Sequence, residues 1–519
     1  MMKKIKSLSK EQLINIFAIT IALVIFLDMD QWLYPFFNSI NIPLPSTFLT
    51  YIWLPLYAFL VFVVLENKKK NTILIASFIG FVCLAYFVIH HFLVKDIPTT
   101  LLLRNFFYYS LKYELMYIFI LVLPLVYIYV IYRLEPSFKQ VEKIMVMVAM
   151  MIAIPILVSN IFLFSPSTYV GWTQANLFTW FSDIYSTFHP REIASKFFFT
   201  EGNTTGIVLF MTFPFTLNLL NRLKGKLIIG SMVIIQGLAM FCIATRVASY
   251  GVLIIMAAYI AIVIFVTIIK KAKLNKQFIL VFAFIFLLFA GMFKFTPAYV
   301  NQQMNIENNW YVLANESLRQ EIKGSLDDPG LDPTSQEYLN FYSHIFVDNA
   351  FLLTTPKIYY MELYDYRLDP KFWVDVIFEY DFYDRIDGRD FQKIFFDFQW
   401  NKLTLPQRMF GFGYSSFMFG GIVLEKDFEM QIYTHGYLGF TLLVLPWLIS
   451  LGYIVYKALR NLKDSINIDV LVSGLSLCGG LICAYSSGHT LDQPFSSLLL
   501  AMLVAILILM LRKGNKANA

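Results

Sequence analysis

The stretch MQIYTHGYLGFTLLVLPWLI, residues 430–449, contains a long apolar run. A histidine, His435, lies about one helical turn inside the start of this run. A run of this length predicts a membrane-spanning helix, because about 20 largely apolar residues are needed to cross the hydrocarbon of a bilayer. A titratable side chain is costly to keep at such a position, so its presence needs a reason. The stretch therefore predicts a membrane-embedded fold and marks a candidate site at the mouth of a helix.

The rest of the chain has the composition of a polytopic membrane protein. Of its 519 residues, 58% are hydrophobic and only 15% are charged. All four cysteines lie inside apolar runs, which argues against disulfides and against a metal cluster. The expected fold is an all-α integral membrane protein with about 12 transmembrane helices. The predicted spans lie near 12–28, 47–65, 72–94, 113–132, 144–164, 204–220, 227–245, 248–269, 277–295, 432–456, 468–486 and 494–511.

Basic residues predict the orientation of these spans, because loops on the cytoplasmic side carry an excess of Lys and Arg. Every second connection, together with both ends of the chain and the adjoining helix ends, holds 23 Lys and Arg against 6 Asp and Glu. Both termini are therefore expected in the cytoplasm. The basic start MMKKIKSLSK is read as the flank of the first helix, since no small-residue cleavage site follows it.

The pattern divides the chain into three predicted parts: helices 1–9 over residues 1–296, a large extracytoplasmic loop domain over 297–431 before helix 10, and helices 10–12 over 432–519. The loop domain holds 21 Asp and Glu against 11 Lys and Arg. Short helices are expected over 301–323 and 335–346, and 372–400 is compatible with interfacial helices or a lid. No phosphate-loop motif occurs, which disfavours nucleotide-driven chemistry inside the cell.

Two residues stand out as catalytic candidates. Arg246 occupies a connection of a few residues at the outer end of helix 7, where a guanidinium can form paired hydrogen bonds to a phosphate or carboxylate. Its structural alternative is a side chain that snorkels to the interface. His435 can exchange a proton near neutral pH, and Gly436 and Gly439 would let another backbone or a substrate approach. Its alternative is a histidine that hydrogen-bonds a neighbouring carbonyl.

Further polar residues at the predicted outer mouth are weaker candidates for substrate binding. Each has a structural alternative: a solvated loop arginine, a polar hairpin, or an N-cap at Asn203 or Thr204 of the following helix. An acidic pair, Asp28 and Asp30, follows the first helix and could serve metal or acceptor binding, or be interfacial only. Asp381, Asp384 and Asp387 are spaced for one helical face, but Gly388 and the lack of histidine argue against a metal site there. The substrate-binding candidates are Arg408, in the motif RMFGFGYSSFMFGG (408–421), Arg191, His489 and Asn203.

Taken together, these motifs resemble the O-antigen ligase and polysaccharide polymerase superfamily. The resemblance covers nearly the whole chain: twelve helices, a large loop before helix 10, an arginine after helix 7, the run GFGYSSF, and HGYLGF opening the next helix. Arg246 matches the arginine of the family and His435 its histidine, while Arg408 and Arg191 are candidates for a second arginine. The acidic stretch EKDFE, 425–429, departs from the family pattern.

The resemblance implies a bacterial glycosyltransferase of the plasma membrane that is independent of metal and of any cofactor. It would move a glycan from an undecaprenyl diphosphate carrier to an acceptor hydroxyl on the outer face, as a surface polysaccharide polymerase or a ligase. The implied partners are the lipid-linked donor, the glycan acceptor, the bilayer and a chain-length regulator protein as a candidate, with no nucleic acid. The alternatives are a flippase for lipid-linked oligosaccharides, a glycosyltransferase that uses Asp28 and Asp30, and a membrane sensor.

Overall fold

The computed structural model describes residues 8–66, 69–95, 97, 109–222, 225–326, 330–353, 355, 357–381, 385, 388–414 and 424–517. Within these ranges the regular structure is helical and contains no strand, and an isolated bridge joins Pro166 and Trp172. The all-α prediction is confirmed. Asp384, Asp387 and the second half of the 408–421 motif lie outside the described residues.

Eleven helices of the described part are long and apolar enough to cross a membrane, and the number rises to twelve if Asp427–Leu443 and Leu445–Arg460 form one span. The prediction of about twelve spans is confirmed, and the pair corresponds to the stretch at 430–449. The eleven are Lys10–Ser39, Pro45–Leu65, Lys69–Val94, Leu111–Leu134, Phe138–Ile161, Gly202–Arg222, Lys226–Ile243, Arg246–Ile269, Lys276–Glu307, Ile468–Ser486 and Pro494–Arg512.

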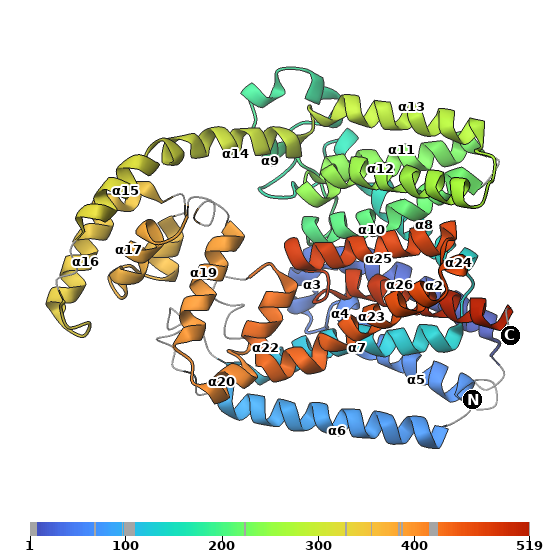
Figure 1. The fold of residues 1–519 in the computed structure, drawn as a ribbon, viewed down its shortest axis with the longest axis horizontal. Coiled ribbons are helices and arrows are strands. Elements are labelled where there is room, and N and C mark those ends of the chain that lie inside the picture. Colours follow the sequence, from blue (N-terminus) through green and yellow to red (C-terminus); the bar gives the residue numbers. More distant parts are fainter. Residues whose placement is uncertain are drawn as a thin grey trace. The chain divides into compact units, whose positions relative to one another are not determined.

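The chain folds into two compact units (Figure 1). The first unit comprises the chain up to Ser77, Phe119–Asn301 and the chain from Leu445 onward, and the second comprises Phe78–Ile118 and Gln302–Val444. Three helices run from one unit into the other: α6 (Lys69–Val94), α7 (Leu111–Leu134) and α14 (Pro297–Ala314). The remaining helices of the first unit are α2 (Lys10–Phe26), η1 (Leu27–Leu33), α3 (Tyr34–Ser39), α4 (Pro45–Phe48), η2 (Leu49–Trp53), α5 (Leu54–Leu65), α8 (Phe138–Ile161), η4 (Leu177–Phe181), η5 (Ile184–Ser186), α9 (Pro190–Ile193), α10 (Gly202–Arg222), α11 (Lys226–Ile243), α12 (Arg246–Ile269), α13 (Lys276–Phe293), α23 (Leu445–Arg460), α24 (Leu462–Ser465), α25 (Ile468–Ser486) and α26 (Pro494–Ala517).

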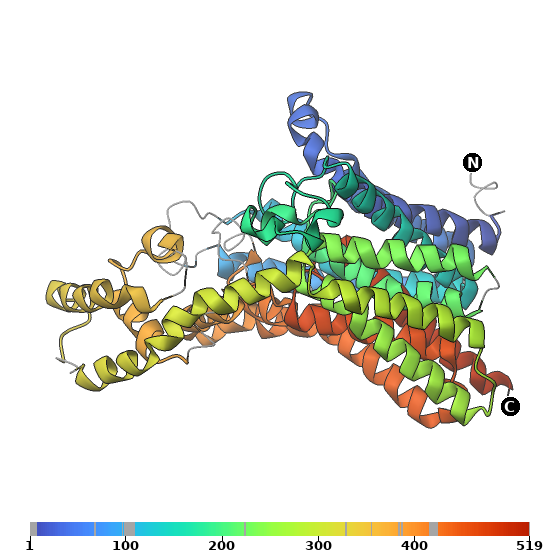
Figure 2. The same cartoon turned by 90° about the horizontal axis from the view of Figure 1, so that it is seen from above.

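Helix α10 forms the centre of the first unit. It packs against α8, α11, α12, α25 and α26, and these helices run alongside one another (Figure 2). It is also the least apolar of the candidate spans. Its polar side chains are satisfied inside the bundle, as when Thr216 donates to Gln236 at 2.7 Å and Gln236 donates to the Leu209 carbonyl at 3.0 Å. A helix enclosed by protein can carry such groups, because a hydrogen-bond partner removes the cost of keeping them out of water.

The outer surfaces of the first unit are apolar. Leu227, Leu280 and Phe284 are exposed, which suits contact with lipid. Helix α8 starts at Phe138, six residues before the predicted span, because Ser137 and Gln140 form a capping box in the polar flank. Hydropathy finds the part of a helix that lies in lipid, whereas capping sets where the helix begins.

The second unit contains most of the residues that are predicted to form the large loop domain. Its helices are α15 (Glu316–Ser325), α16 (Gln336–Asn349), η6 (Ala350–Leu352), η7 (Tyr359–Leu363), α17 (Pro370–Phe378), α19 (Gly388–Asn401), α20 (Leu405–Phe410) and α22 (Asp427–Leu443). Helices α15 and α16, together with α14, fulfil the prediction of helices over 301–323 and 335–346, while α17 and α19 occupy 372–400. Aromatic side chains make the core of these loop helices, with Trp373 fully buried and its ring near those of Phe346 and Phe391.

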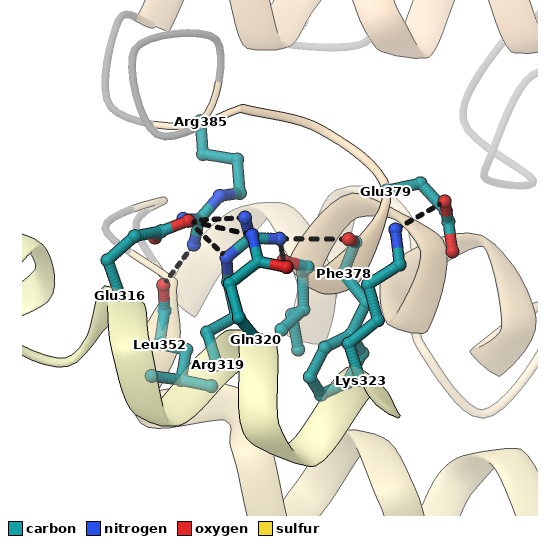
Figure 3. Close-up of polar contacts among 9 residues, drawn as sticks. Glu316, Arg319, Gln320, Lys323, Leu352, Phe378, Glu379 and Arg385 are labelled. Carbon is teal, nitrogen blue, oxygen red and sulfur yellow. Dashed lines mark hydrogen bonds and ion pairs between the residues drawn. The ribbon is translucent and has the colours of Figure 1, made fainter. Parts of the chain in front are cut away.

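Two buried arginines share one carboxylate in this unit (Figure 3). Glu316 accepts from Arg319 and from Arg385, whose Nη2 is 2.7 Å from Oε2 of Glu316. Arg319 also donates to the carbonyls of Ile377 and Phe378 at the end of α17, at 3.1 and 2.8 Å. Burial opposes ionisation of Glu316, but the two arginines outweigh it and lower its pKa. The cluster therefore ties α15 to the C-terminal end of α17, where a cation is favoured.

Candidate functional site

His435 lies fully buried at a break in α22. The break is at Gly436, whose φ of 67° and ψ of −176° are outside the helical region and are essentially restricted to glycine. The predicted role of this glycine as a point of close approach is confirmed. A Cβ at Gly436 would lie 2.4 Å from the backbone carbon of Met409 and from the Phe410 nitrogen. The break thus places the histidine next to a second segment of backbone.

That second segment is the described part of the RMFGFGYSSF motif. The amides of Phe412 and Gly413 donate to the carbonyls of Tyr433 and Thr434, both at 2.8 Å. These carbonyls would otherwise lose partners at the break, since Gly436 interrupts the helix that follows. The motif therefore satisfies the backbone around His435, and nothing in this geometry resembles a nucleotide-binding loop.

The hydrogen bonds around Thr434 assign the tautomer of His435. The Thr434 hydroxyl donates to the Met430 carbonyl at 2.7 Å, and its oxygen lies 2.9 Å from Nδ1 of His435. A hydroxyl has one proton, so Oγ1 must accept from an Nδ1–H. The lone pair of the neutral ring is then on Nε2, which is buried and has no hydrogen-bond partner among the described residues. This is the arrangement a general base requires.

Aromatic and polar neighbours hold the ring. The Tyr117 ring lies nearly parallel to that of His435 with centroids 5.4 Å apart, and the His90 ring does so at 5.7 Å. The Tyr86 hydroxyl donates to the His435 carbonyl at 2.9 Å. His90 in turn contacts Glu114, with 3.3 Å between its Nε2 and Oε2 of the carboxylate. All of these residues are buried and belong to the second unit.

His90 and Glu114 are not among the site residues predicted from the sequence. Both lie in or next to predicted spans, at 72–94 and 113–132, where an ionisable residue is a functional candidate by default. Their place inside apolar runs is the signal in the sequence that marks them. Their pairing with each other was not evident, because α6 and α7 are separate helices.

Arg246 is the first residue of α12 and belongs to the first unit. Thr245 caps the helix by accepting from the Ala248 amide at 3.3 Å, and Arg246 is exposed at the helix start. Within the described residues the structure gives this guanidinium no hydrogen bond and no ion pair. An arginine without a carboxylate partner is available to an anion. The predicted meeting of Arg246 with His435 stays a prediction.

The two candidates for a second arginine, Arg408 and Arg191, differ in the contacts that their guanidinium groups make. Arg408 donates to the carbonyls of Trp400 and Asn401, at 3.2 and 2.9 Å, and so holds the end of α19. These contacts favour the structural alternative for Arg408. Arg191 is exposed in α9, and its guanidinium carbon lies 5.6 Å from the centre of the Tyr169 ring. A stacked, exposed arginine of this kind keeps its donors available.

His489 and Asn203 both lie in the first unit. His489 adopts a left-handed conformation with φ of 59°, and its Nδ1 is 3.1 Å from the Asp492 carboxylate. The polar hairpin between α25 and α26 is therefore internally paired. Helix α10 begins at Gly202, so Asn203 and Thr204 are already inside its first turn and the N-cap interpretation is wrong. The half-buried Asn203 stays a predicted substrate contact.

The acidic pair after the first helix has structural partners. Asp28 accepts from the Thr200 amide at 3.0 Å, and Asp30 accepts from the amide and hydroxyl of Ser46 at 2.6 and 2.7 Å. Asp30 thereby caps the start of α4. Each carboxylate thus has a structural partner, which leaves fewer of its oxygens for a metal or a sugar. These contacts weaken the alternative in which Asp28 and Asp30 carry the chemistry.

Eleven to twelve candidate spans in the described part define a multi-pass membrane protein. The chain belongs to the family of O-antigen ligase like membrane proteins, whose model matches residues 10–514. This membership supports a membrane enzyme of polysaccharide chemistry with glycosyltransferase-type activity, in agreement with the resemblance seen in the motifs. No curated protein and no solved structure matches the chain.

Proposed function

We propose that this protein transfers or polymerises oligosaccharide units carried on undecaprenyl diphosphate, at the outer face of the bacterial cytoplasmic membrane. The observation that carries the proposal is the buried Nε2 of His435, which has no hydrogen-bond partner among the described residues, in a chain of the O-antigen ligase like family. A buried acceptor without a donor costs about 1–3 kcal/mol, so it is retained where a substrate supplies the donor. The acceptor hydroxyl of a sugar is such a donor.

In the proposed reaction, the acceptor hydroxyl oxygen attacks the anomeric carbon of the donor sugar. Its proton passes to Nε2 of His435, and a new C–O bond forms. The bond between the anomeric carbon and the carrier diphosphate breaks, and the diphosphate leaves with the electron pair. Attack from the face opposite the phosphate inverts the anomeric carbon. General base catalysis of this kind contributes about 10²–10⁴-fold to a rate.

The leaving diphosphate gains negative charge, which a guanidinium can neutralise through paired hydrogen bonds. Arg246 is proposed for this role because it is exposed and lacks a partner in the described part of the first unit. Arg191, with its exposed guanidinium, is the stronger of the two candidates for a second phosphate contact. A diphosphate is already a good leaving group, so the proposal requires no metal and no nucleotide.

The acceptor distinguishes a polymerase, which extends another lipid-linked chain, from a ligase, which uses a different surface molecule. A cell-surface or capsular polysaccharide polymerase is the favoured form, with the loop helices of the second unit over the sugars and a chain-length regulator as a candidate partner. The abundance of lysine, asparagine and isoleucine fits an AT-rich bacterial genome. Both termini are proposed to be cytoplasmic and residues 297–431 extracytoplasmic.

The test is a chain-length assay on purified full-length protein in liposomes that contain its native lipid-linked repeat. His435→Ala and Arg246→Ala should each abolish elongation while the protein still folds. His344→Ala is the matched control, because its side chain is 81% exposed in α16. Normal elongation by His435→Ala would refute the proposed base. Movement of lipid-linked oligosaccharide across the bilayer without any change in glycan length would instead indicate a flippase.

A further inference from the structure

Gln431 lies four residues before His435 on α22 and is fully buried. Its Nε2 donates to the Tyr117 hydroxyl at 2.6 Å. Its Oε1 is buried too, and no hydrogen-bond partner for it is found in the part of the chain that the structure describes. The same is true of Nε2 of His435. A buried acceptor without a donor is costly, so each of these atoms is a place where a ligand can supply the donor.

These two acceptors belong to one face of α22. Residues four apart on a helix are neighbours on its surface, with about 5–6 Å between their Cβ atoms. Gln431 and His435 both precede the break at Gly436, so this spacing applies to them. Tyr117 of α7 contacts both side chains. Its hydroxyl accepts from Gln431, and its ring lies nearly parallel to that of His435 with centroids 5.4 Å apart. One molecule beside this face can therefore meet both acceptors.

Other buried side-chain oxygens of the second unit lack this arrangement. Oε2 of Glu429 also has no partner among the described residues, but Glu429 is six residues from His435 and so lies on a different face of α22. Oε1 of Gln392 is in the same situation on α19. Within the described ranges no hydrogen bond or ring contact links Gln392 with His435 or Tyr117. Gln431 is therefore distinguished by its place beside the proposed base.

We propose that Gln431 is a specificity-determining residue that binds the acceptor sugar. The reacting hydroxyl donates to Nε2 of His435. A second donor on an adjacent carbon of the same sugar, either a hydroxyl or the N–H of an acylamino group, donates to Oε1 of Gln431. The two contacts together orient the reacting oxygen. The second donor keeps its proton, since the reaction transfers only the proton that passes to His435.

This inference rests on the proposed function and narrows its substrate class. The acceptor sugar must carry an unsubstituted hydroxyl or acylamino group next to the hydroxyl that becomes glycosylated. An acceptor without that group would leave Oε1 of Gln431 unpaired in the complex, and sites built to hydrogen-bond a substrate reject such analogues strongly. A primary hydroxyl at C6 of a hexopyranose also fails the requirement, because its neighbouring carbon bears the ring oxygen and no donor.

The first test uses the wild-type protein. The purified full chain in liposomes makes polysaccharide from its native lipid-linked repeat, and methylation analysis with NMR identifies the carbon that the new bond joins. We expect a neighbouring carbon of that sugar to carry a hydroxyl or an acylamino group without a substituent. A new bond to C6 of a hexopyranose would overturn the inference. So would a bond to a carbon whose neighbours are deoxy or fully substituted.

The second test uses two variants of Gln431 in the same elongation assay. Gln431→Met has a similar length and volume but no acceptor, so kcat/KM for the repeat should fall about 10- to 100-fold. Gln431→Glu keeps an oxygen that accepts in either protonation state, so it should retain most of the wild-type value. Inhibition by undecaprenyl diphosphate, the leaving product, reports donor binding and should be the same in all three proteins. Gln392→Met is the matched control and should elongate normally.

A purely structural role of Gln431 predicts that Gln431→Met and Gln431→Glu lower the melting temperature and leave kcat/KM per folded molecule unchanged. That result would overturn the inference. If Gln431→Met does not fold, the linkage analysis of the wild-type product decides. Failure of the proposed function is distinguishable, because normal elongation by His435→Ala would remove the base and this inference with it. If His435→Ala is inactive while Gln431→Met keeps the wild-type kcat/KM, only the role of Gln431 fails.

Discussion

Gly411 and Gly436 meet backbone to backbone at the break in α22. A Cβ on Gly411 would lie 2.5 Å from the Gly436 nitrogen and 2.5 Å from the Thr434 carbonyl oxygen, and both glycines have positive φ. The two positions are separated in sequence by the connection between α20 and α22, yet at each of them the backbone of the other segment occupies the place of a side chain. The contact explains why a glycine-rich motif precedes the helix that carries His435. Glycines let the two segments come close enough for backbone hydrogen bonds to form between them.

Gly436→Ala should destabilise the protein and abolish activity. The backbone conformation alone costs an alanine about 1–3 kcal/mol, and the backbone of Met409 leaves no room for a Cβ. Thermal unfolding and the chain-length assay measure both effects. Gly452→Ala in α23 is the control, because a Cβ there meets nothing within 4 Å. Equal melting temperatures for the two variants would contradict the structure of the break.

Thr434→Val should lower kcat and leave KM unchanged. Valine has a similar shape but cannot accept from Nδ1–H of His435, so the tautomer with its lone pair on Nε2 loses its support. The expected loss is about tenfold, which corresponds to one net hydrogen bond of about 1.4 kcal/mol. Thr434→Ser keeps the hydroxyl and should retain most of the rate. If serine and valine are equally impaired, the hydroxyl does not set the tautomer.

Arg246→Ala and Arg408→Ala should fail in different ways. Loss of Arg246 should abolish elongation at an unchanged melting temperature, because its guanidinium has no partner within the described structure. Loss of Arg408 should lower the melting temperature, because the carbonyls of Trp400 and Asn401 lose their donor. Elongation per folded molecule should change little in that case. The reverse pattern would exchange the two proposed roles.

Glu316→Gln should loosen the loop helices of the second unit. Arg319 and Arg385 are 3% and 1% exposed, and the variant removes the carboxylate charge that these two buried cations share. Breaking such a pair costs about 3 kcal/mol. Hydrogen exchange of the amides in Pro370–Phe378 reports the change. Glu379→Gln is the control, since its ion pair with Lys323 is exposed and of little weight.

The same cluster predicts a pH dependence. The arginines hold the pKa of Glu316 below its ordinary value against the opposing effect of burial. A glutamate with a lowered pKa in the folded state stabilises the fold fully above the ordinary value of 4.5, and this stabilisation is lost as the pH falls through the lowered value. Exchange in α17 should therefore rise in the wild type only once the pH falls below the ordinary value of a glutamate. In Glu316→Gln it should be fast at neutral pH as well.

Much of the fold could be predicted from the sequence, because the conditions for crossing a bilayer apply to each helix separately. Each span must form its own backbone hydrogen bonds and present apolar side chains. Runs such as 248–269 and 494–511 can therefore be recognised without knowledge of the neighbouring helices. Helix ends were less predictable. The capping box at Ser137 starts α8 in a polar flank that hydropathy does not register, and α10 starts before Asn203.

The candidate site was only half predictable. His435 was evident, since an imidazole in an apolar run is conspicuous, and its two glycines indicated a close approach. His90 and Glu114 were not predicted, because they are notable for their contact with each other. In the sequence they are 24 residues apart and lie on different helices. Arg408 was weighed as a phosphate contact because a sequence does not show that two carbonyls already occupy its donors.

The sequence by itself determined that the chain is a multi-pass helical membrane protein with a histidine at the mouth of a late helix, because hydropathy and charge act residue by residue along the chain. Only the tertiary structure decided which groups surround that histidine, where its lone pair lies and which acid–imidazole pair stands beside it. The physical reason is that hydrogen bonds and close contacts are short-ranged, so they depend on how distant segments fold together and leave no periodic trace in the sequence.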